Sequence, residues 1–514
     1  MGPTPSSTHN VGLWTTRRAE LAGDRTALVD ADRRLDYAGL HDRTCRLAAV
    51  LAGRGVAAGD RVGLLLHNRS AYLEAVFACA RLGAIAVPIN ARFTAPEVRQ
   101  VLADCTPRML LHESDLSEVA ARAGAGLAPA PDPLACPDTY ERALADAAPR
   151  TQVEPVTPDH PMILLYTSGT TGVPKGALLP HRKTLFNSLN AQLFFELSAS
   201  DRVLVVLPLF HSFGLLILSL PTLYAGGSVI LASRFGAEDT WRSVAAERIT
   251  FLGAVPTQLR ELLAADPARH DTRTLRFLFG AGAAVPVEQI LAFERAGIVL
   301  KQGFGQTETS ILCCLEARDA VRKAGSVGRP VFHADVRVVR IADLAGPPEG
   351  WRETAPGETG EIVVRGPITM LGYWQRPEAT AETLRGEWLR TGDLATRDEE
   401  GFLTLVGRAR DMYISGGENV YPAEVESVLA EHPDVSEVAV IGVPDPTWGE
   451  TGCAFVVPAR SGFREEAVLA WAAERLARFK LPRRFVAVEA LPRTDTGKVQ
   501  KHRLAQRLSR EAIR

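Results

Sequence analysis

The chain has 514 residues, of which 46% are hydrophobic and 23% charged. These values are typical of globular proteins, and the length predicts two to four domains that each bury their own core. The formal net charge of -2 argues against general attraction to nucleic acids or to membrane surfaces.

The cysteine count of seven is odd, and no two cysteines form a C-x-x-C pair. A chain of this length does not need disulfides to fold, so a reduced, cytoplasmic protein is expected. The adjacent Cys313 and Cys314 suit neither a zinc site nor an ordinary disulfide, and they are expected to fill a core. The longest apolar stretch, residues 213–232, is interrupted by Pro221 and by two glycines, which favours a buried helix and strand over a membrane span.

Residues 34–110 alternate between two patterns. "YAGLHDRTCRLAAVLAGRGV" and "AYLEAVFACARLGA" have helical spacing, whereas "DRVGLLL" and "IAVPIN" are typical of buried strands. The same alternation recurs over residues 202–282. Apolar strands separated by helices predict parallel sheets covered on both faces. The fold class is therefore predicted as α/β, with two doubly wound halves and functional loops at the carboxyl ends of strands.

Three later segments differ in pattern. The Pro/Ala-rich residues 127–160 are predicted to be a surface connection without core elements. After residue 325, period-two segments joined by Gly/Pro turns predict antiparallel strands of a small barrel-like sheet. The last part of the chain predicts a small α+β domain, which places the domains at 1–408 and 409–514.

The segment "YTSGTTGVPKG", residues 166–176, combines three glycines with hydroxyl residues and Lys175. Glycines let backbone N–H groups approach anionic oxygens, and hydroxyls add donors, which favours a phosphate-binding loop. It is not the P-loop of nucleotide hydrolases, because Pro174 stands where the helix of that motif would begin. We therefore expect a mobile loop that wraps a leaving phosphate group. On its own, the segment is equally compatible with a solvated Gly/Thr hairpin.

A second cluster is "GFGQTET", residues 303–309. Phe304 could stack on a base, Thr307 could donate to a phosphate, and Glu308 could bind Mg²⁺. The alternative is an ordinary turn that enters a helix. In a third segment, "WLRTGDLA", Asp393 follows a glycine, and its carboxylate could bind a ribose diol or simply cap a turn.

Two more clusters lie towards the end of the chain. In "GRARDMYISGGENVYPAEVE", residues 407–426, Arg408 is charged, and Gly416 and Gly417 would allow close approach of a ligand or another segment. The alternative is an ordinary linker. In "LPRTDTGKVQK" a glycine precedes Lys498, and the alternative there is a solvated basic tail.

Together, in this order and at these separations, the five segments resemble the adenylate-forming superfamily of acyl-CoA synthetases, luciferases and adenylation domains that load carrier proteins. The resemblance covers residues 10–505, and residues 166–176 and 407–426 are its most specific parts. It implies that a carboxylate attacks the α-phosphate of Mg-ATP, giving an acyl-adenylate and pyrophosphate. A thiol, usually that of coenzyme A, then attacks the adenylate. ATP, Mg²⁺ and coenzyme A are thus the implied co-substrates and metal.

By this resemblance Lys498 bridges the carboxylate and α-phosphate oxygens, Glu308 binds Mg²⁺, and Thr307 contacts the α-phosphate. A positioned ammonium that neutralises two anions in a dry site favours their reaction. Only seven of the 58 basic residues are lysines, and Lys175 and Lys498 are among them. Phe304 replaces the tyrosine usual in the family and is expected to keep the stack on adenine. The implied ATP-binding set is Thr167, Ser168, Gly169, Thr170, Thr171, Gly172, Lys175, Gly303, Phe304, Gly305, Thr307, Asp393, Arg408 and Lys498.

For the second half-reaction the resemblance implies that the small domain rotates about a hinge at Arg410. Lys498 then leaves, and the glycine pair lines the thiol tunnel. Leu481 stands where some relatives carry an arginine, so coenzyme A docking is expected to differ in detail. The implied coenzyme A contacts are Arg92, Gly416, Gly417, Trp448 and Arg483.

The acyl pocket is implied to contain His211, Ser212, Phe213, Leu215, Gly280, Ala281, Gly282, Ala283 and Ile311. His211 matches a residue that gates the acid, and its alternative is a satisfied core histidine. Ser212 and Phe213 stand where amino-acid-activating relatives place an aspartate, so an amino-acid substrate is not expected. The apolar lining predicts a fatty or an aromatic acid without separating them.

The leading hypothesis is an acid–CoA ligase, and the alternative is an acyl-AMP ligase that loads the phosphopantetheine of a carrier protein. A catalytically inactive binding module is disfavoured by the retention of Lys175, Glu308, Asp393, Arg408 and Lys498. Neither nucleic acid nor a membrane span is expected, and a homodimer is left open.

Overall fold

The computed structural model describes residues 6–167, 174–283, 285–415, 418–460, 463–494, 497 and 499–511. The chain forms two compact units. Unit 1 is Met1–Asp335 with Val364–Leu389, and unit 2 is Val336–Val363 with Arg390–Arg514. Arg410 lies inside unit 2, so the boundary at residues 408/409 and the hinge stay predictions.

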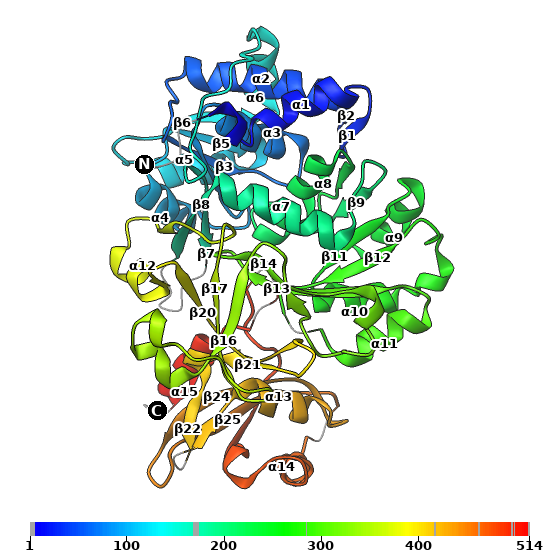
Figure 1. The fold of residues 1–514 in the computed structure, drawn as a ribbon, viewed down its shortest axis with the longest axis vertical. Helices are drawn as coiled ribbons and strands as arrows, with labels where there is room; N and C mark the ends of the chain where they lie inside the picture. Colours follow the sequence, from blue (N-terminus) through cyan, green and yellow to red (C-terminus); the bar gives the residue numbers. More distant parts are fainter. Residues whose placement is uncertain are drawn as a thin grey trace. The chain divides into compact units, whose positions relative to one another are not determined.

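Unit 1 contains a seven-stranded sheet with the order β18-β8-β7-β4-β3-β5-β6 (Figure 1). Strands β3 to β7 pair in parallel wherever they are neighbours, and β8 closes an antiparallel hairpin with β7. The strands are β3 (Arg61–Leu65), β4 (Ile85–Pro88), β5 (Met109–Glu113), β6 (Asp132–Cys136), β7 (Pro161–Thr167), β8 (Lys175–Pro180) and β18 (Gly372–Tyr373).

The second sheet of unit 1 has nine strands in the order β15-β14-β13-β12-β11-β9-β10-β1-β2. Its central strands are parallel, and its two edges are antiparallel. The strands are β1 (Thr26–Val29), β2 (Arg34–Asp36), β9 (Arg202–Val205), β10 (Ser228–Leu231), β11 (Phe251–Ala254), β12 (Phe277–Gly280), β13 (Leu300–Gln306), β14 (Ser310–Leu315) and β15 (Arg329–Pro330). The predicted pair of doubly wound halves is confirmed.

Helices cover these sheets, and α7 contacts both of them through β8 and β14 (Figure 1). The helices of unit 1 are α1 (Leu13–Ala22), α2 (Tyr37–Gly53), α3 (Ser70–Arg81), α4 (Ala95–Cys105), α5 (Ser117–Gly124), α6 (Asp138–Asp146), α7 (His181–Phe195), α8 (Leu220–Ala225), α9 (Ala237–Ala246), α10 (Pro256–Ala264), α11 (Val287–Arg295) and α12 (Pro377–Thr383). Every residue of α3 is buried. A buried charge needs a partner, and Glu74 of α3 has two: Arg43 at 2.8 Å and the Tyr140 hydroxyl at 2.5 Å.

The prediction that residues 127–160 form only a surface connection is wrong. This stretch contains β6, a parallel neighbour of β5, and α6, which buries Tyr140 and Leu144. β6 is an edge strand, where Pro133 costs little because one side of the strand has no pairing partner. Tyr140 and Leu144 stand four residues apart on one face of a single short helix, so they give little periodic signal in the sequence.

Residues 213–232 form a buried helix followed by a strand, as predicted. A π-helical turn over Phe213–Ser219 continues into α8, and β10 follows. Within the described ranges no helix is long and apolar enough to cross a membrane. All seven cysteines are free; Cys313 is buried in the core as expected, whereas Cys314 is half-buried.

The rest of the chain forms two small sheets. The first has the order β16-β17-β20-β19, with β21 also paired to β20, and confirms the predicted small antiparallel sheet. Its strands are β16 (Asp335–Val339), β17 (Gly360–Arg365), β19 (Leu384–Arg385), β20 (Trp388–Arg397) and β21 (Leu403–Arg408).

The second small sheet lies in unit 2 and has the order β23-β22-β25-β24, with β26 beside β25. Its elements are β22 (Tyr413–Ser415), β23 (Glu418–Val420), α13 (Pro422–Ala430), β24 (Val435–Asp445), β25 (Gly449–Pro458), α14 (Glu465–Ala473), β26 (Arg484–Ala487) and α15 (Lys501–Glu511). The mixture of helices and strands predicted for the last part of the chain is therefore present.

Candidate active site

The loop "YTSGTTGVPKG" is carried by the hairpin of β7 and β8. Thr167 and Lys175 face each other in the antiparallel register, and the Thr167 hydroxyl donates to the Lys175 carbonyl at 3.3 Å. The hairpin therefore fixes both ends of the loop. Five predicted ATP ligands, Ser168, Gly169, Thr170, Thr171 and Gly172, lie outside the described residues.

The "GFGQTET" cluster does not enter a helix; β13 turns directly into the antiparallel strand β14. Its glycines are required by close packing. A Cβ at Gly305 would stand 1.9 Å from the Ser310 carbonyl oxygen, and one at Gly303 would stand 2.5 Å from the Phe279 ring. Phe304 lies between these glycines and is half-buried, as is Thr307 in the turn.

Glu308 is only 8% exposed, and Tyr373 of β18 donates its hydroxyl to the Glu308 carboxylate at 2.8 Å. The Lys175 ammonium lies 5.4 Å from the centroid of the same tyrosine ring. Glu308 and Lys175, both predicted for the ATP site, thus contact the same side chain, Tyr373, which the sequence analysis missed. Tyr373 lies 65 residues from Glu308, and nothing in its local pattern signals this contact.

Glu308 fits a magnesium ion that arrives with its nucleotide. Among the residues with described positions, no cluster of three or more histidine, cysteine or acidic side chains could hold a resident metal. Mg²⁺ usually keeps several waters and binds through one or two carboxylates plus substrate phosphates. The single buried carboxylate of Glu308 is therefore compatible with a Mg²⁺ ion that is bound together with ATP. It could not hold a metal ion without other ligands.

Lys183 of α7 is a second feature that the sequence analysis missed. It is 1% exposed, and its ammonium contacts the hydroxyl of Ser310, at the start of β14. Burial lowers the pKa of Lys183 from 10.5 to about 7, against the opposing effect of the Glu308 carboxylate. α7 therefore supports the turn that carries Glu308 through a buried lysine whose charged form is disfavoured by burial.

This lowered pKa predicts a pH-dependent stability. Above pH 7 the folded chain has released the Lys183 proton while the unfolded chain retains it up to its usual pKa, so the free energy of unfolding rises with pH. Lys183→Met removes the titrating amine and with it this rise of the unfolding free energy with pH. The free energy of unfolding of the variant minus that of the parent should therefore fall above pH 7, by up to about 1.4 kcal/mol per pH unit. Urea unfolding across this range measures it, and a constant difference would contradict the lowered pKa.

The residues predicted for the acyl pocket come from neighbouring elements of unit 1. The rings of Phe213 and Phe279 meet edge to face, with centroids 5.5 Å apart. Gly280 ends β12, directly opposite Ala254 of β11. Leu215, Ala281 and Ile311 are buried, whereas Gly282 and Ala283 are exposed. Phe279, which is buried, is thus an aromatic neighbour of the predicted pocket residue Phe213 that sequence reasoning did not find.

Asn187 of α7 links two of these elements. Its amide group donates to the Leu216 carbonyl at 2.6 Å and accepts from the Ile311 backbone N–H at 3.2 Å. This bridge fixes the π-helical turn against β14. His211 and Ser212 precede the turn and are half-buried, and the His211 ring lies 4.8 Å from the Phe210 ring.

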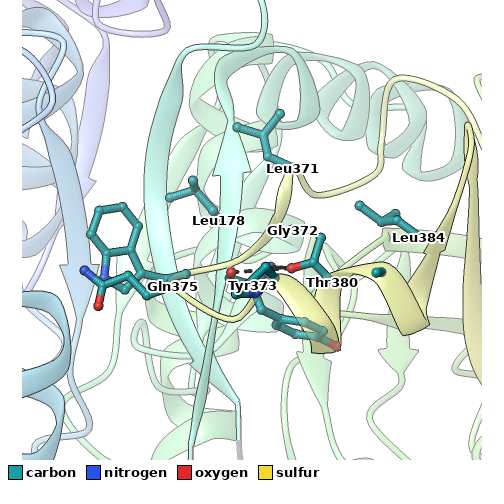
Figure 2. A pocket seen from close by; sticks show the side chains of 10 residues that line it. Leu178, Leu371, Gly372, Tyr373, Gln375, Thr380 and Leu384 are labelled. Carbon is teal, nitrogen blue, oxygen red and sulfur yellow. Dashed lines mark hydrogen bonds between the residues drawn. The ribbon is translucent and has the colours of Figure 1, made fainter.

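A pocket of 380 Å³ opens between β8, β18 and α12 (Figure 2). Tyr373 lines it, but Glu308, Lys175 and the predicted acyl residues do not. Its lining residues are Leu178, Leu371, Gly372, Tyr373, Trp374, Gln375, Pro377, Thr380, Ala381 and Leu384. The pocket therefore meets the predicted ATP site only at Tyr373 and shares no lining residue with the predicted acyl pocket.

Unit 2 places Asp393 and Arg408 together. They face each other in the pairing of β20 with β21, and Nε of Arg408 lies 2.8 Å from Oδ1 of Asp393. Asp393 is 5% exposed, and its backbone N–H bonds the Thr391 hydroxyl at 3.0 Å. A buried carboxylate oriented by an arginine is suited to accept two hydroxyl donors, as a ribose diol offers.

We expect Asp393→Asn to raise the KM for ATP about tenfold, since hydrogen bonds to a charged group contribute about 1.5–3 kcal/mol. The amide keeps the shape of the side chain, so kcat should change less than KM. ATP–pyrophosphate exchange measures both. Asp398→Asn is the matched control because Asp398 caps the turn between the same two strands. Equal effects at both positions would argue against the ribose role.

The predicted coenzyme A contacts are partly brought together in unit 2. The Arg483 guanidinium lies 4.9 Å from the centroid of the Trp448 ring, and the Trp448 backbone N–H donates to Asp445 at 2.9 Å. Arg92 is an exposed residue of unit 1. Gly416, Gly417 and Lys498 lie outside the described residues. The predicted hinge residue Arg410 lies in a single helical turn between β21 and β22, and its Nε is 3.6 Å from Oδ1 of the next residue, Asp411.

Two family matches cover most of this chain. Residues 15–374 match the AMP-binding enzyme family, and residues 424–498 match the AMP-binding enzyme C-terminal domain.

Three curated relatives illustrate the similarity. A feruloyl-CoA synthase of Amycolatopsis sp is 42% identical over 500 residues, which cover 97% of this chain and 99% of the relative. An indoleacetate–CoA ligase of Aromatoleum aromaticum is 41% identical over 519 residues, or 97% and 98% of the two chains. A long-chain-fatty-acid–CoA ligase of Mycobacterium tuberculosis is 36% identical over 510 residues, or 97% and 99%.

Two solved structures share the fold. ATP-bound MatB from Rhodopseudomonas palustris superposes with a TM-score of 0.89 at 30% identity, covering 97% of this chain and 98% of MatB. The o-succinylbenzoate CoA synthetase of Bacillus subtilis, in complex with its acyl-adenylate intermediate, gives a TM-score of 0.86 at 32% identity and covers 98% of each chain.

Proposed function

This chain belongs to the family of AMP-binding enzymes and is an acid–CoA ligase, and from this premise we propose that it activates an aromatic carboxylic acid. Within the structure, the observation that supports ATP-dependent activation is the convergence of Lys175 and Glu308 on Tyr373. One cation and one carboxylate at a shared side chain suit a metal-bound polyphosphate. ATP, coenzyme A and Mg²⁺ are the co-substrates and metal of this reaction class.

The reaction has two steps. An oxygen of the substrate carboxylate attacks the α-phosphorus of ATP, and the bond to the bridging oxygen of the β-phosphate breaks, releasing pyrophosphate. The coenzyme A sulfur then attacks the acyl carbon, its proton is lost, and AMP leaves. Bound Mg²⁺ would neutralise phosphate charge. We propose that Glu308 holds this ion, that Thr307 contacts the α-phosphate, and that Lys498 brings the two anions together.

The remaining site residues take their roles within this proposal. Lys175 and residues 167–172 bind the leaving pyrophosphate, Phe304 stacks on adenine, and Asp393 with Arg408 binds the ribose. Arg483 and Trp448, together with Arg92, Gly416 and Gly417, bind coenzyme A. Residues 409–514 act as a mobile domain about Arg410 and change the residues at the acyl carbon between the two steps.

Two observations favour an aromatic over a fatty acid. The relatives named for ferulate and indoleacetate are 42% and 41% identical, against 36% for the fatty-acid ligase. In addition, Phe213 and Phe279 form an edge-to-face pair at the predicted pocket, and an aromatic substrate can extend such a pair. A long flexible chain gains less from this fixed geometry.

The test is acid-dependent release of AMP and pyrophosphate in the presence of ATP, Mg²⁺ and coenzyme A. The acids would be matched series: ferulate, indoleacetate and benzoate against octanoate and palmitate. We expect the highest kcat/KM within the aromatic series. A preference for palmitate would replace the aromatic proposal with the fatty one, and release of ADP or of no AMP would contradict the ligase assignment.

A second candidate acceptor is a carrier-protein phosphopantetheine, which presents the same thiol arm as coenzyme A. Acyl transfer to a holo-carrier but not to free coenzyme A would favour it. We place the enzyme in the cytoplasm, where ATP and coenzyme A are supplied and where its seven free cysteines stay reduced. A homodimer is also proposed, and its test is the mass of the enzyme in solution.

A further inference from the structure

Residues 371–374 run antiparallel to β8, the strand that begins at Lys175. The Leu371 backbone N–H donates to the Leu178 carbonyl at 2.9 Å, and the Trp374 backbone N–H donates to the Gly176 carbonyl at 2.7 Å. Tyr373 therefore stands opposite Ala177 in the register. Since residues two apart share one face of a strand, the Tyr373 ring is the diagonal neighbour of Lys175.

We propose that Tyr373 is a positioning residue that couples the loop ammonium of Lys175 to the metal-binding carboxylate of Glu308. The ring lies 5.4 Å from the Lys175 ammonium, and the hydroxyl donates to Glu308 at 2.8 Å. The Met370 backbone N–H also donates to the Glu308 carbonyl at 2.8 Å, so the same segment holds the main chain of Glu308. This inference rests on the proposed function, because the ligand that spans the two groups is Mg-ATP.

Tyr373 has a rigid backbone. Its N–H donates to the Thr380 hydroxyl at 2.9 Å (Figure 2), and that hydroxyl donates to the Arg376 carbonyl at 2.8 Å. Gly372 has a φ of +147° and touches Thr380 so closely that a Cβ would stand 2.7 Å from its methyl group. α12 therefore fixes the main chain from which the tyrosine ring extends.

Asp104 of α4 connects this segment to the other end of the phosphate loop. Its carboxylate accepts from Arg376 at 2.6 Å and from the hydroxyl of Tyr166 at 2.6 Å. The Trp374 indole donates to the Asp104 carbonyl at 3.2 Å. Tyr166 directly precedes Thr167, so the segment of Tyr373 is tied to both strands that carry the loop.

The geometry separates two functions of the one side chain. The ring faces the cation of Lys175, and the hydroxyl faces the carboxylate of Glu308. A phenylalanine keeps the first contact and removes the second, whereas a leucine removes both. Tyr373→Phe should therefore affect magnesium-dependent binding, and Tyr373→Leu should also affect binding of the metal-free nucleotide.

The experiment is calorimetric binding of ATP to the full chain, with Mg²⁺ and with excess chelator. The parent should bind ATP more tightly with Mg²⁺ than without it. We expect Tyr373→Phe to reduce this magnesium-dependent gain about tenfold and to leave metal-free affinity unchanged. Tyr373→Leu should in addition lower metal-free affinity a few-fold, since a cation–π contact contributes less than a charge-assisted hydrogen bond.

The matched control is Tyr140→Phe, which removes the same kind of bond, from a tyrosine hydroxyl to the buried Glu74 carboxylate, outside the ATP site. Its magnesium-dependent gain should equal that of the parent, and thermal unfolding shows that each variant is folded. If Tyr373→Phe does not fold, Glu308→Gln tests the same link, and it should reduce the magnesium-dependent gain.

Two outcomes would overturn the inference: an unchanged magnesium-dependent gain in Tyr373→Phe, or an equal loss of affinity with and without the ion. In a double-mutant cycle, adding Tyr373→Phe to Glu308→Gln should cause no further loss of that gain. Failure of ATP-dependent activation itself gives a different result, because the parent would then bind no ATP.

Discussion

Replacing Lys498 by alanine is expected to reduce adenylate formation by roughly 10²–10³-fold, the range found when one preorganised charge-stabilising group is removed. The substrate carboxylate and the α-phosphate are both anions, and they must approach within bonding distance. Without the ammonium, their repulsion adds directly to the barrier of the first step. Acid-dependent ATP–pyrophosphate exchange measures this step in isolation.

The second step should be largely spared, because the attack of a thiol on a preformed adenylate does not bring those two anions together. The variant, supplied with synthetic acyl-adenylate and coenzyme A, should form thioester at close to the parent rate. Lys501→Ala is the matched control. It lies three residues away on α15, where Lys501 pairs with Glu426 at 2.7 Å, and it should show no selective loss. Equal loss of both half-reactions in Lys498→Ala would refute the assigned role.

Much of the fold could be predicted because the sheet strands are continuous apolar runs. "DRVGLLL" and "IAVPIN" become β3 and β4, which are buried on both faces between helices. β6 could not be predicted in the same way, because it is a short edge strand that contains a proline. A continuous apolar run indicates a strand that is buried on both faces. The edge strand β6 is partly exposed, so its sequence contains no such run.

Site residues that lie within a local sequence motif could be predicted. Site residues that are brought in by pairing between distant strands could not. Glu308 and Lys175 stand in recognisable segments. Tyr373 contacts Glu308 and Lys175 because β18 pairs with β8. The sequences of the two strands do not by themselves predict the register of that pairing. Lys183 and Asn187 are similar cases, since each acts across an interface between α7 and a neighbouring element.

The glycines of residues 303–305 show a different limit. The resemblance places Gly303 and Gly305 in the predicted ATP-binding set. The structure gives a packing reason for both glycines, because the Phe279 ring and the Ser310 carbonyl lie too close to leave room for a Cβ atom. A glycine-rich segment therefore indicates close approach of some group, and only the structure identifies that group as protein.

Glu308→Gln is expected to lower adenylate formation about 100-fold, because a neutral amide oxygen is a much weaker Mg²⁺ ligand than a carboxylate. The substitution is nearly isosteric. The amide oxygen can still accept the Tyr373 hydroxyl, which now lies 2.8 Å from the carboxylate, so the turn between β13 and β14 should keep its position. Loss of activity would then report the charge rather than the fold.

The dependence on magnesium distinguishes this role from general damage to the site. In Glu308→Gln, raising the Mg²⁺ concentration should recover part of the exchange rate, because a weakened site is filled by mass action. Glu361→Gln is the matched control, since Glu361 is also a buried glutamate, and its carboxylate pairs with Arg390 at 2.7 Å. That variant is expected to lose stability without a shift in magnesium dependence. If Glu308→Gln kept the parent's magnesium dependence while losing activity, the carboxylate would act on the turn and not on the metal.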